Sequence, residues 1–143
     1  MRIYRYYEDF SVGDRYQTVP VVVSESDIIA FATQFDPQLI HISGANAIAS
    51  GWHTAALTRR LFITSDECQL PPGSLELGVS GLKWLRPVYP EDSLSLTIEV
   101  MALRQSESHP GHGIITYHLT TSNQDGEEVM VMETSMILPT MGG

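Results

Sequence analysis

The chain has 143 residues, of which 43% are hydrophobic and 17% charged, and its formal net charge is −9. This length and composition fit one globular domain over residues 1–143 and exclude an intrinsically disordered chain. The single cysteine, Cys68, excludes an intramolecular disulfide, and the acidic balance argues against nucleic-acid binding, which calls for a basic face. No apolar run is as long as a membrane span, and the charged start is unlike a signal peptide. We therefore expect neither a nucleic-acid nor a membrane partner, and a cytoplasmic location.

The first predicted elements are a strand at about residues 16–23 and a helix directly after it. Ser24 can cap the N-terminus of this helix, and apolar residues then recur at helical spacing. Pro37 disfavours helical geometry for Asp36. The helix is therefore predicted to end near Phe35, and Asp36 begins a loop.

Two more helices are predicted before the chain becomes rich in strands. Ser43 can cap a short helix that ends at Ala49. A longer helix is predicted to begin near Gly51 and end near Thr64, and small residues fill its first half. Such a helix is typical of a central element around which other backbone packs closely.

The second half of the chain predicts four strands, because apolar and polar residues alternate between turn-forming segments. They span residues 75–85, 93–104, 114–122 and 127–138. We expect an α+β fold in which an antiparallel sheet covers the long helix, with consecutive strands joined as a meander. An exposed edge strand could pair with a second copy of the protein.

The first candidate for chemistry is an acid and an imidazole in one loop, Asp36 and His41. A bent loop could place both side chains around one small reactant, and a carboxylate base with a histidine acid suits proton transfer near neutral pH. The alternative is structural: Asp36 would cap the next turn, and His41 would be half-buried.

The second candidate is Gly51, at the expected start of the central helix. Free backbone N–H groups there can bind an anion or a developing oxyanion, and a glycine lets a carbonyl group approach closely. Close packing of the helix against the sheet explains the same glycine equally well. His53 is interpreted as a packed helix residue, and His109 and His112 as part of a solvated turn, so no metal site is expected.

Five segments together carry a family resemblance. They are residues 7–14, 35–41, 49–55, 85–92 and 123–127. With them, nearly the whole chain resembles the MaoC-like dehydratases, the hotdog-fold group that includes the (R)-specific enoyl-CoA hydratases.

The resemblance implies a hotdog fold, a long central helix wrapped by an antiparallel sheet, and a homodimer or higher oligomer formed by joining two sheets. It implies that Asp36 acts as a base on one water, that His41 delivers a proton, and that the Gly51 N–H holds the thioester oxygen. The substrate would be an acyl-CoA or acyl-carrier thioester, with coenzyme A as part of the substrate and no separate cofactor.

Contacts to the substrate are expected from Ser50, Trp52, Arg59, Lys83 and Arg86. Arg59 stands where some hydratases of the group carry a serine, which predicts a short or an acidic acyl group. Two alternatives stay open: an acyl-CoA thioesterase on the same fold, and an acyl-thioester binding protein without catalysis.

Overall fold

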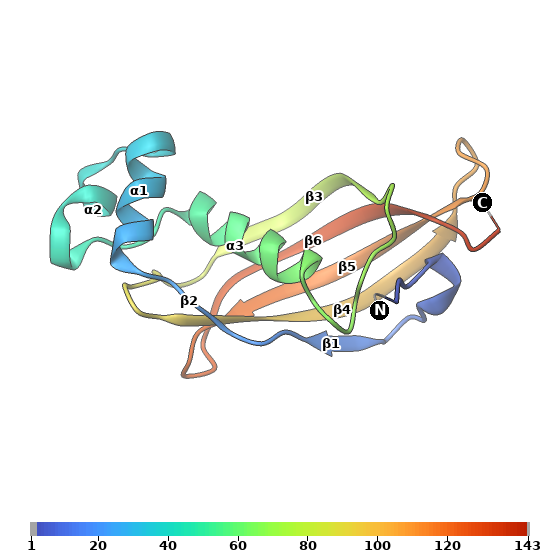
Figure 1. The fold of residues 1–143 in the computed structure, drawn as a ribbon, viewed down its shortest axis with the longest axis horizontal. Helices are drawn as coiled ribbons and strands as arrows, with labels where there is room; N and C mark the ends of the chain where they lie inside the picture. Colours follow the sequence, from blue (N-terminus) through green and yellow to red (C-terminus); the bar gives the residue numbers. More distant parts are fainter. Residues whose placement is uncertain (1–2, 143) are drawn as a thin grey trace.

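Six strands form one antiparallel sheet in the computed structural model, which describes residues 3–142 (Figure 1). The strands are β1 (Arg15–Gln17), β2 (Val21–Val22), β3 (Leu75–Trp84), β4 (Ser93–Gln105), β5 (His112–Ser122) and β6 (Glu128–Pro139). Their order is β1-β4-β5-β6-β3, and β2 also pairs with β4.

The expected meander is confirmed for β4, β5 and β6 and is wrong for β3. This strand precedes β4 in the chain, yet it pairs with β6 at the far edge of the sheet. After α3 the chain lies beside β1, where residues 64–67 and Gln17 line one pocket, and the segment that follows crosses to the far edge and begins β3 (Figure 1). β3 thereby comes to face the helix, and this position matters for the site described below.

The helices are α1 (Glu25–Phe35), α2 (Leu39–Ile42) and α3 (Gly51–Ile63), with short 3-10 turns at Tyr7–Asp9 and Gly44–Asn46. The helix predicted over residues 43–49 is wrong. α2 ends before it, and Gly44, with a φ of 82°, begins only a 3-10 turn. The strand predicted over residues 16–23 is divided into β1 and β2, because Pro20 between them has no N–H to donate to a ladder.

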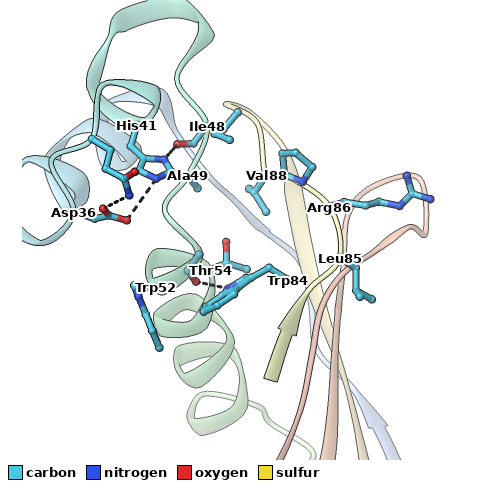
Figure 2. A pocket seen from close by; sticks show the side chains of 13 residues that line it. Asp36, His41, Ile48, Ala49, Trp52, Thr54, Trp84, Leu85, Arg86 and Val88 are labelled. Atoms are coloured by element: carbon cyan, nitrogen blue, oxygen red, sulfur yellow. Dashed lines mark hydrogen bonds and ion pairs between the residues drawn. The ribbon is translucent and has the colours of Figure 1, made fainter. Parts of the chain in front are cut away.

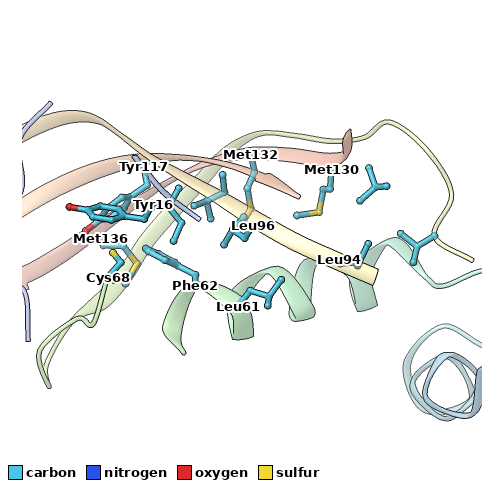
Figure 3. Close-up of a cluster of buried hydrophobic side chains, with 14 of the residues drawn as sticks. Tyr16, Leu61, Phe62, Cys68, Leu94, Leu96, Tyr117, Met130, Met132 and Met136 are labelled. Carbon is cyan, nitrogen blue, oxygen red and sulfur yellow. The ribbon is translucent and has the colours of Figure 1, made fainter. Parts of the chain in front are cut away.

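The core lies between α3 and the sheet. Alternate residues of β4, Leu94, Leu96, Ile98 and Val100, are at most 1% exposed. Figure 3 shows Leu61 and Phe62 of α3 beside this layer. Burying each such side chain contributes about 1.5–3 kcal/mol, so the helix is firmly fixed on the sheet.

The N-terminus of α3 and the two smaller helices meet at one end of the molecule. α1 and α2 lie at the end of the sheet opposite the chain termini (Figure 1).

A buried hydrogen bond of 2.6 Å between the hydroxyls of Thr58 and Thr121 also ties α3 to β5. None of the helices within residues 3–142 is both long and apolar enough to cross a bilayer.

Candidate functional site

The segment between α1 and α3 brings Asp36 and His41 together. Asp36 ends α1, where its backbone N–H donates to the Ala32 carbonyl, and His41 lies in α2. The Nε2 atom of His41 is 3.5 Å from Oδ2 of Asp36 (Figure 2). His41 is 8% exposed, so the pair stands at the edge of the interior with limited access to water.

A backbone carbonyl fixes the proton positions of the His41 ring. Its Nδ1 lies 2.7 Å from the carbonyl oxygen of Ile48. Because a carbonyl oxygen only accepts hydrogen bonds, Nδ1 carries the proton. Nε2, which faces Asp36, is then the nitrogen of this ring that can gain or lose a proton.

Two hydrogen-bond donors hold the Asp36 carboxylate. Gln38 donates from Nε2 to Oδ1 at 2.8 Å, and the Ser50 hydroxyl donates to Oδ2 at 2.7 Å. Both bonds favour the charged carboxylate. The Gln38 bond first, and then the Ser50 bond, therefore hold the pKa of Asp36 below its usual range.

Ser50 lies beneath the carboxylate and is fully buried. Its hydroxyl oxygen accepts from the backbone N–H of Trp52 at 3.2 Å, as the N-cap of α3, while the hydroxyl hydrogen is donated to Asp36. Ser50 therefore connects the carboxylate to the start of the helix. The contact between Ser50 and the substrate that the sequence predicts stays a prediction.

Gly51 is the first residue of α3, where backbone N–H groups have no partner within the helix. The indole Nε1 of Trp84 donates to the Gly51 carbonyl at 2.8 Å. A Cβ atom on Gly51 would lie 2.5 Å from the Trp84 ring, so any larger residue here would force the ring to move. The ring thus packs directly on the helix start (Figure 2).

These groups open onto one cavity of about 430 Å³, which we call the Asp36 cavity. Its wall includes Asp36, Gln38, His41, Gly51, Trp52 and Trp84. Arg86 also lines it, and its guanidinium forms an exposed ion pair with Glu127 at 3.2 Å. Two of the expected substrate contacts, Trp52 and Arg86, therefore lie at this cavity.

A second cavity of about 510 Å³, the Arg59 cavity, lies between α3 and β3. Trp52 and Trp84 line both cavities, and Arg59 of α3 and Glu76 of β3 line the second. Lys83 is exposed on β3 and is not among the described residues that line either cavity.

No cluster of three or more histidine, cysteine, aspartate or glutamate side chains suited to a metal ion occurs within residues 3–142. His53 is 7% exposed, and its ring stacks on Phe31 with 4.7 Å between the ring centres. It packs between α3 and α1 and lines neither cavity.

Sequence reasoning missed the roles of Gln38, Trp84 and Glu76. Gln38 stands two residues from Asp36, and that short spacing was a usable signal for a hydrogen bond. Trp84 and Glu76 reach α3 from β3, across a long stretch of chain. Only knowledge of where β3 sits in the sheet could have found them.

The chain is similar to known proteins over most of its length. A family model described as "MaoC like domain" matches residues 9–123. The uncharacterized protein YdeM of Bacillus subtilis is 30% identical over 141 residues, which cover 92% of this chain and 96% of that protein.

Solved structures give the same result for the fold and its family. The crystal structure of a MaoC-like dehydratase from Rhodospirillum rubrum superposes with a TM-score of 0.87 at 36% identity, covering 95% of this chain and 97% of that one. The R-hydratase PhaJ1 from Pseudomonas aeruginosa has a TM-score of 0.76 at 26% identity, covering 94% and 86%. The expected hotdog fold, α+β with an antiparallel sheet around a central helix, is thereby confirmed.

Proposed function

The chain belongs to the MaoC-like domain family, and from this premise we propose that it adds water to trans-2-enoyl thioesters or removes water from 3-hydroxyacyl thioesters. The similarity to an R-hydratase and to a MaoC-like dehydratase supports the general class of hydratase or dehydratase. The observation that carries the specific proposal is the meeting of Asp36, His41 and the Gly51 end of α3 at one cavity.

In the proposed hydration, one water is held between Asp36 and the protonated His41. Asp36 takes a proton from this water as its oxygen bonds to the β-carbon, and His41 gives the proton on Nε2 to the α-carbon. The two residues then differ from their starting state by one proton. Its return from Asp36 to Nε2, across the 3.5 Å between these atoms, restores the site.

The thioester oxygen gains negative charge as the water adds, and we assign its stabilisation to the backbone N–H of Gly51. A preorganised donor aimed at a developing oxyanion is commonly the largest single contribution to such catalysis. The reaction calls for no metal or redox cofactor, because the thioester itself acidifies the α-carbon. Coenzyme A or an acyl carrier enters as part of the substrate. We propose that Arg86 contacts its anionic groups by exchanging its exposed partner Glu127 for them.

An absorbance assay tests this proposal. Crotonyl-CoA is mixed with the protein, and loss of the conjugated absorbance is followed. A parallel reaction with a disulfide reagent reports release of free thiol. Loss of absorbance without thiol release is expected. Thiol release would instead indicate a thioesterase, and thermal stabilisation by the ligand without turnover of any thioester would indicate a binding protein.

The exposed edge of β3 supports a second proposal, that two copies join through this strand. β3 pairs with β6 on one side, and its residues Leu75, Leu77 and Val79 are 65%, 54% and 46% exposed. An apolar edge strand is a template for pairing with another chain. We expect Leu77→Lys to reduce the mass measured by light scattering, whereas an unchanged mass would contradict this interface.

A further inference from the structure

The two cavities are neighbours along α3. Trp52 and Trp84 line both of them. Trp52, Ala55 and Arg59 follow one another at i, i+3 and i+7, so they share one face of the helix and form one wall of the Arg59 cavity. The two indole rings meet edge to face at the junction, with 5.0 Å between their centres, so a group that extends from Gly51 toward Arg59 has to pass beside this pair.

The Arg59 cavity is apolar along its walls and charged at one side. Its walls include Ala55, Leu82 and Met132, and the charged groups are Arg59 and Glu76, which form an ion pair. The two side chains are about one-third exposed, at 30% and 32%.

Further contacts fix this pair in place. The Thr134 hydroxyl of β6 donates to the same Glu76 carboxylate. Arg59 also places Nη1 3.7 Å from the sulfur of Met136, and its Cζ lies 5.7 Å from the centre of the Phe62 ring. The guanidinium is therefore packed against the core beneath α3 as well as paired with a carboxylate.

The position of Arg59 limits the length of a bound acyl group. It lies about two turns, or about 12 Å of helix, beyond Gly51. Its guanidinium lies over the ring of Phe62, further along α3, and pairs with Glu76 near the start of β3, so the charged pair stands at the end of the Arg59 cavity far from Gly51. A longer apolar chain would have to displace the ion pair or bury it unpaired, and both are costly.

The charge of the pair also selects against an acidic acyl group. The positive charge of Arg59 is already neutralised by Glu76, and a second carboxylate would be repelled by Glu76. Resting on the function proposed above, we propose that the Arg59–Glu76 pair closes the acyl end of the site and restricts the substrate to short, uncharged acyl groups. Crotonyl thioester is the type example.

The test is a chain-length series of trans-2-enoyl-CoAs with four, six, eight and ten carbons. For the unaltered protein we expect kcat/KM to fall at least about tenfold from the shortest to the eight- and ten-carbon substrates. Arg59→Leu combined with Glu76→Leu should recover at least about tenfold on the long substrates. Arg60→Leu, the exposed neighbour on another face of α3, is the matched control and should keep the original profile. Equal use of all lengths by the unaltered protein would overturn the proposal, even if the double variant did not fold.

A binding measurement separates this proposal from the proposed reaction. Thermal stabilisation of the unaltered protein is measured with the saturated thioesters butyryl-, octanoyl- and succinyl-CoA, which cannot be hydrated. Butyryl-CoA should stabilise most. If no enoyl-CoA is turned over and butyryl-CoA still stabilises more than the other two, the hydratase proposal fails and the closed acyl site stands. Equal or greater stabilisation by octanoyl- or succinyl-CoA would overturn the closed site.

Discussion

Two carboxylates, Asp36 and Glu76, stand beside the two cavities that meet at the tryptophans. Each accepts a hydrogen bond from a hydroxyl group, Ser50 in one case and Thr134 in the other. Each also faces a basic side chain. The difference lies in that partner, because Asp36 faces the imidazole of His41 and Glu76 faces the guanidinium of Arg59.

The partner decides what each carboxylate can do. An imidazole gains and loses a proton near neutral pH, so the pair of Asp36 and His41 can pass a proton to and from a substrate. A guanidinium keeps its proton under all physiological conditions. The pair at Glu76 can therefore hold its position and shape a cavity, while the proposed proton transfer is assigned to the Gly51 end of α3. The predictions below test this division of roles.

The largest effect is expected from Asp36→Asn. The amide keeps the size of the side chain but cannot accept a proton from water. Hydration of crotonyl-CoA should fall by on the order of 10²–10⁴-fold, measured as kcat under saturating substrate. Glu76→Gln is the matched change at the other carboxylate. It should change how kcat/KM depends on acyl chain length and leave the pH dependence of kcat unchanged. Activity of Asp36→Asn equal to that of the unaltered protein would remove Asp36 from the mechanism.

Gly51→Ala is expected to have the next largest effect. The new Cβ would lie 2.5 Å from the ring of Trp84, so the ring must move and its hydrogen bond to the Gly51 carbonyl is disturbed. Misplacing an oxyanion donor costs about 10²-fold in kcat. Trp84→Ala combined with Gly51→Ala removes the clash. The rate of crotonyl-CoA hydration in the absorbance assay should then be higher than for Gly51→Ala alone. No recovery in the double variant would mean that the collision with Trp84 is not the cause.

Ser50→Ala should lower kcat/KM by about tenfold, because it removes a hydrogen bond to a charged group. The loss of this donor also raises the pKa of Asp36, since the Ser50 bond holds that pKa down. The proposed base must be ionised, so activity is lost as the pH falls through this pKa. The acid limb of the pH profile should therefore move to higher pH.

Ser24→Ala is the matched control for the lost helix cap. Ser24 caps α1 by accepting from the Asp27 N–H, at the opposite end of this helix from Asp36. Removing either cap should cost about 1 kcal/mol of unfolding free energy in a denaturant titration. Only Ser50→Ala should move the acid limb. If neither variant moves the acid limb of the pH profile, Ser50 acts only as the N-cap of α3 and does not tune Asp36.

The same division between regions explains how much of this structure was predictable. α1, α3 and the alternating strands β4 to β6 follow from local patterns, because each presents one apolar face to the same core. Asp36 and His41 stand close in one loop, so their meeting was also a local expectation. Ser50 was expected to contact the substrate, and its bond to Asp36 could not be foreseen because it depends on how α1 and α3 dock.

The long-range parts could not be predicted in this way. β3 is exposed along almost its whole length, so its sequence gives no burial pattern that specifies its neighbour. Its place beside β6 is what brings Trp84 onto Gly51 and Glu76 onto Arg59. The Arg59 side chain was expected to meet substrate directly, and its pairing with Glu76 emerges only from that topology.

The smallest effect is expected at His53, a buried imidazole in the first turn of α3. Burial lowers the pKa of His53, and the charge of Asp27 opposes this only in part. The unfolded chain therefore takes up the proton at a higher pH than the folded protein does. The free energy of unfolding should fall as the pH decreases from about 6.5, the ordinary pKa of histidine, through the lower folded value.

His53→Gln removes this proton uptake. Its unfolding free energy should depend less steeply on pH in that window, by at most about 1.4 kcal/mol per pH unit, as measured by denaturant titrations at several pH values. His109→Gln, at an exposed position, controls for the loss of an imidazole. The pH dependence of kcat/KM should be the same as in the unaltered protein, because His53 lines neither cavity. A shifted activity profile in His53→Gln would show that proton transfer is not confined to Asp36 and His41.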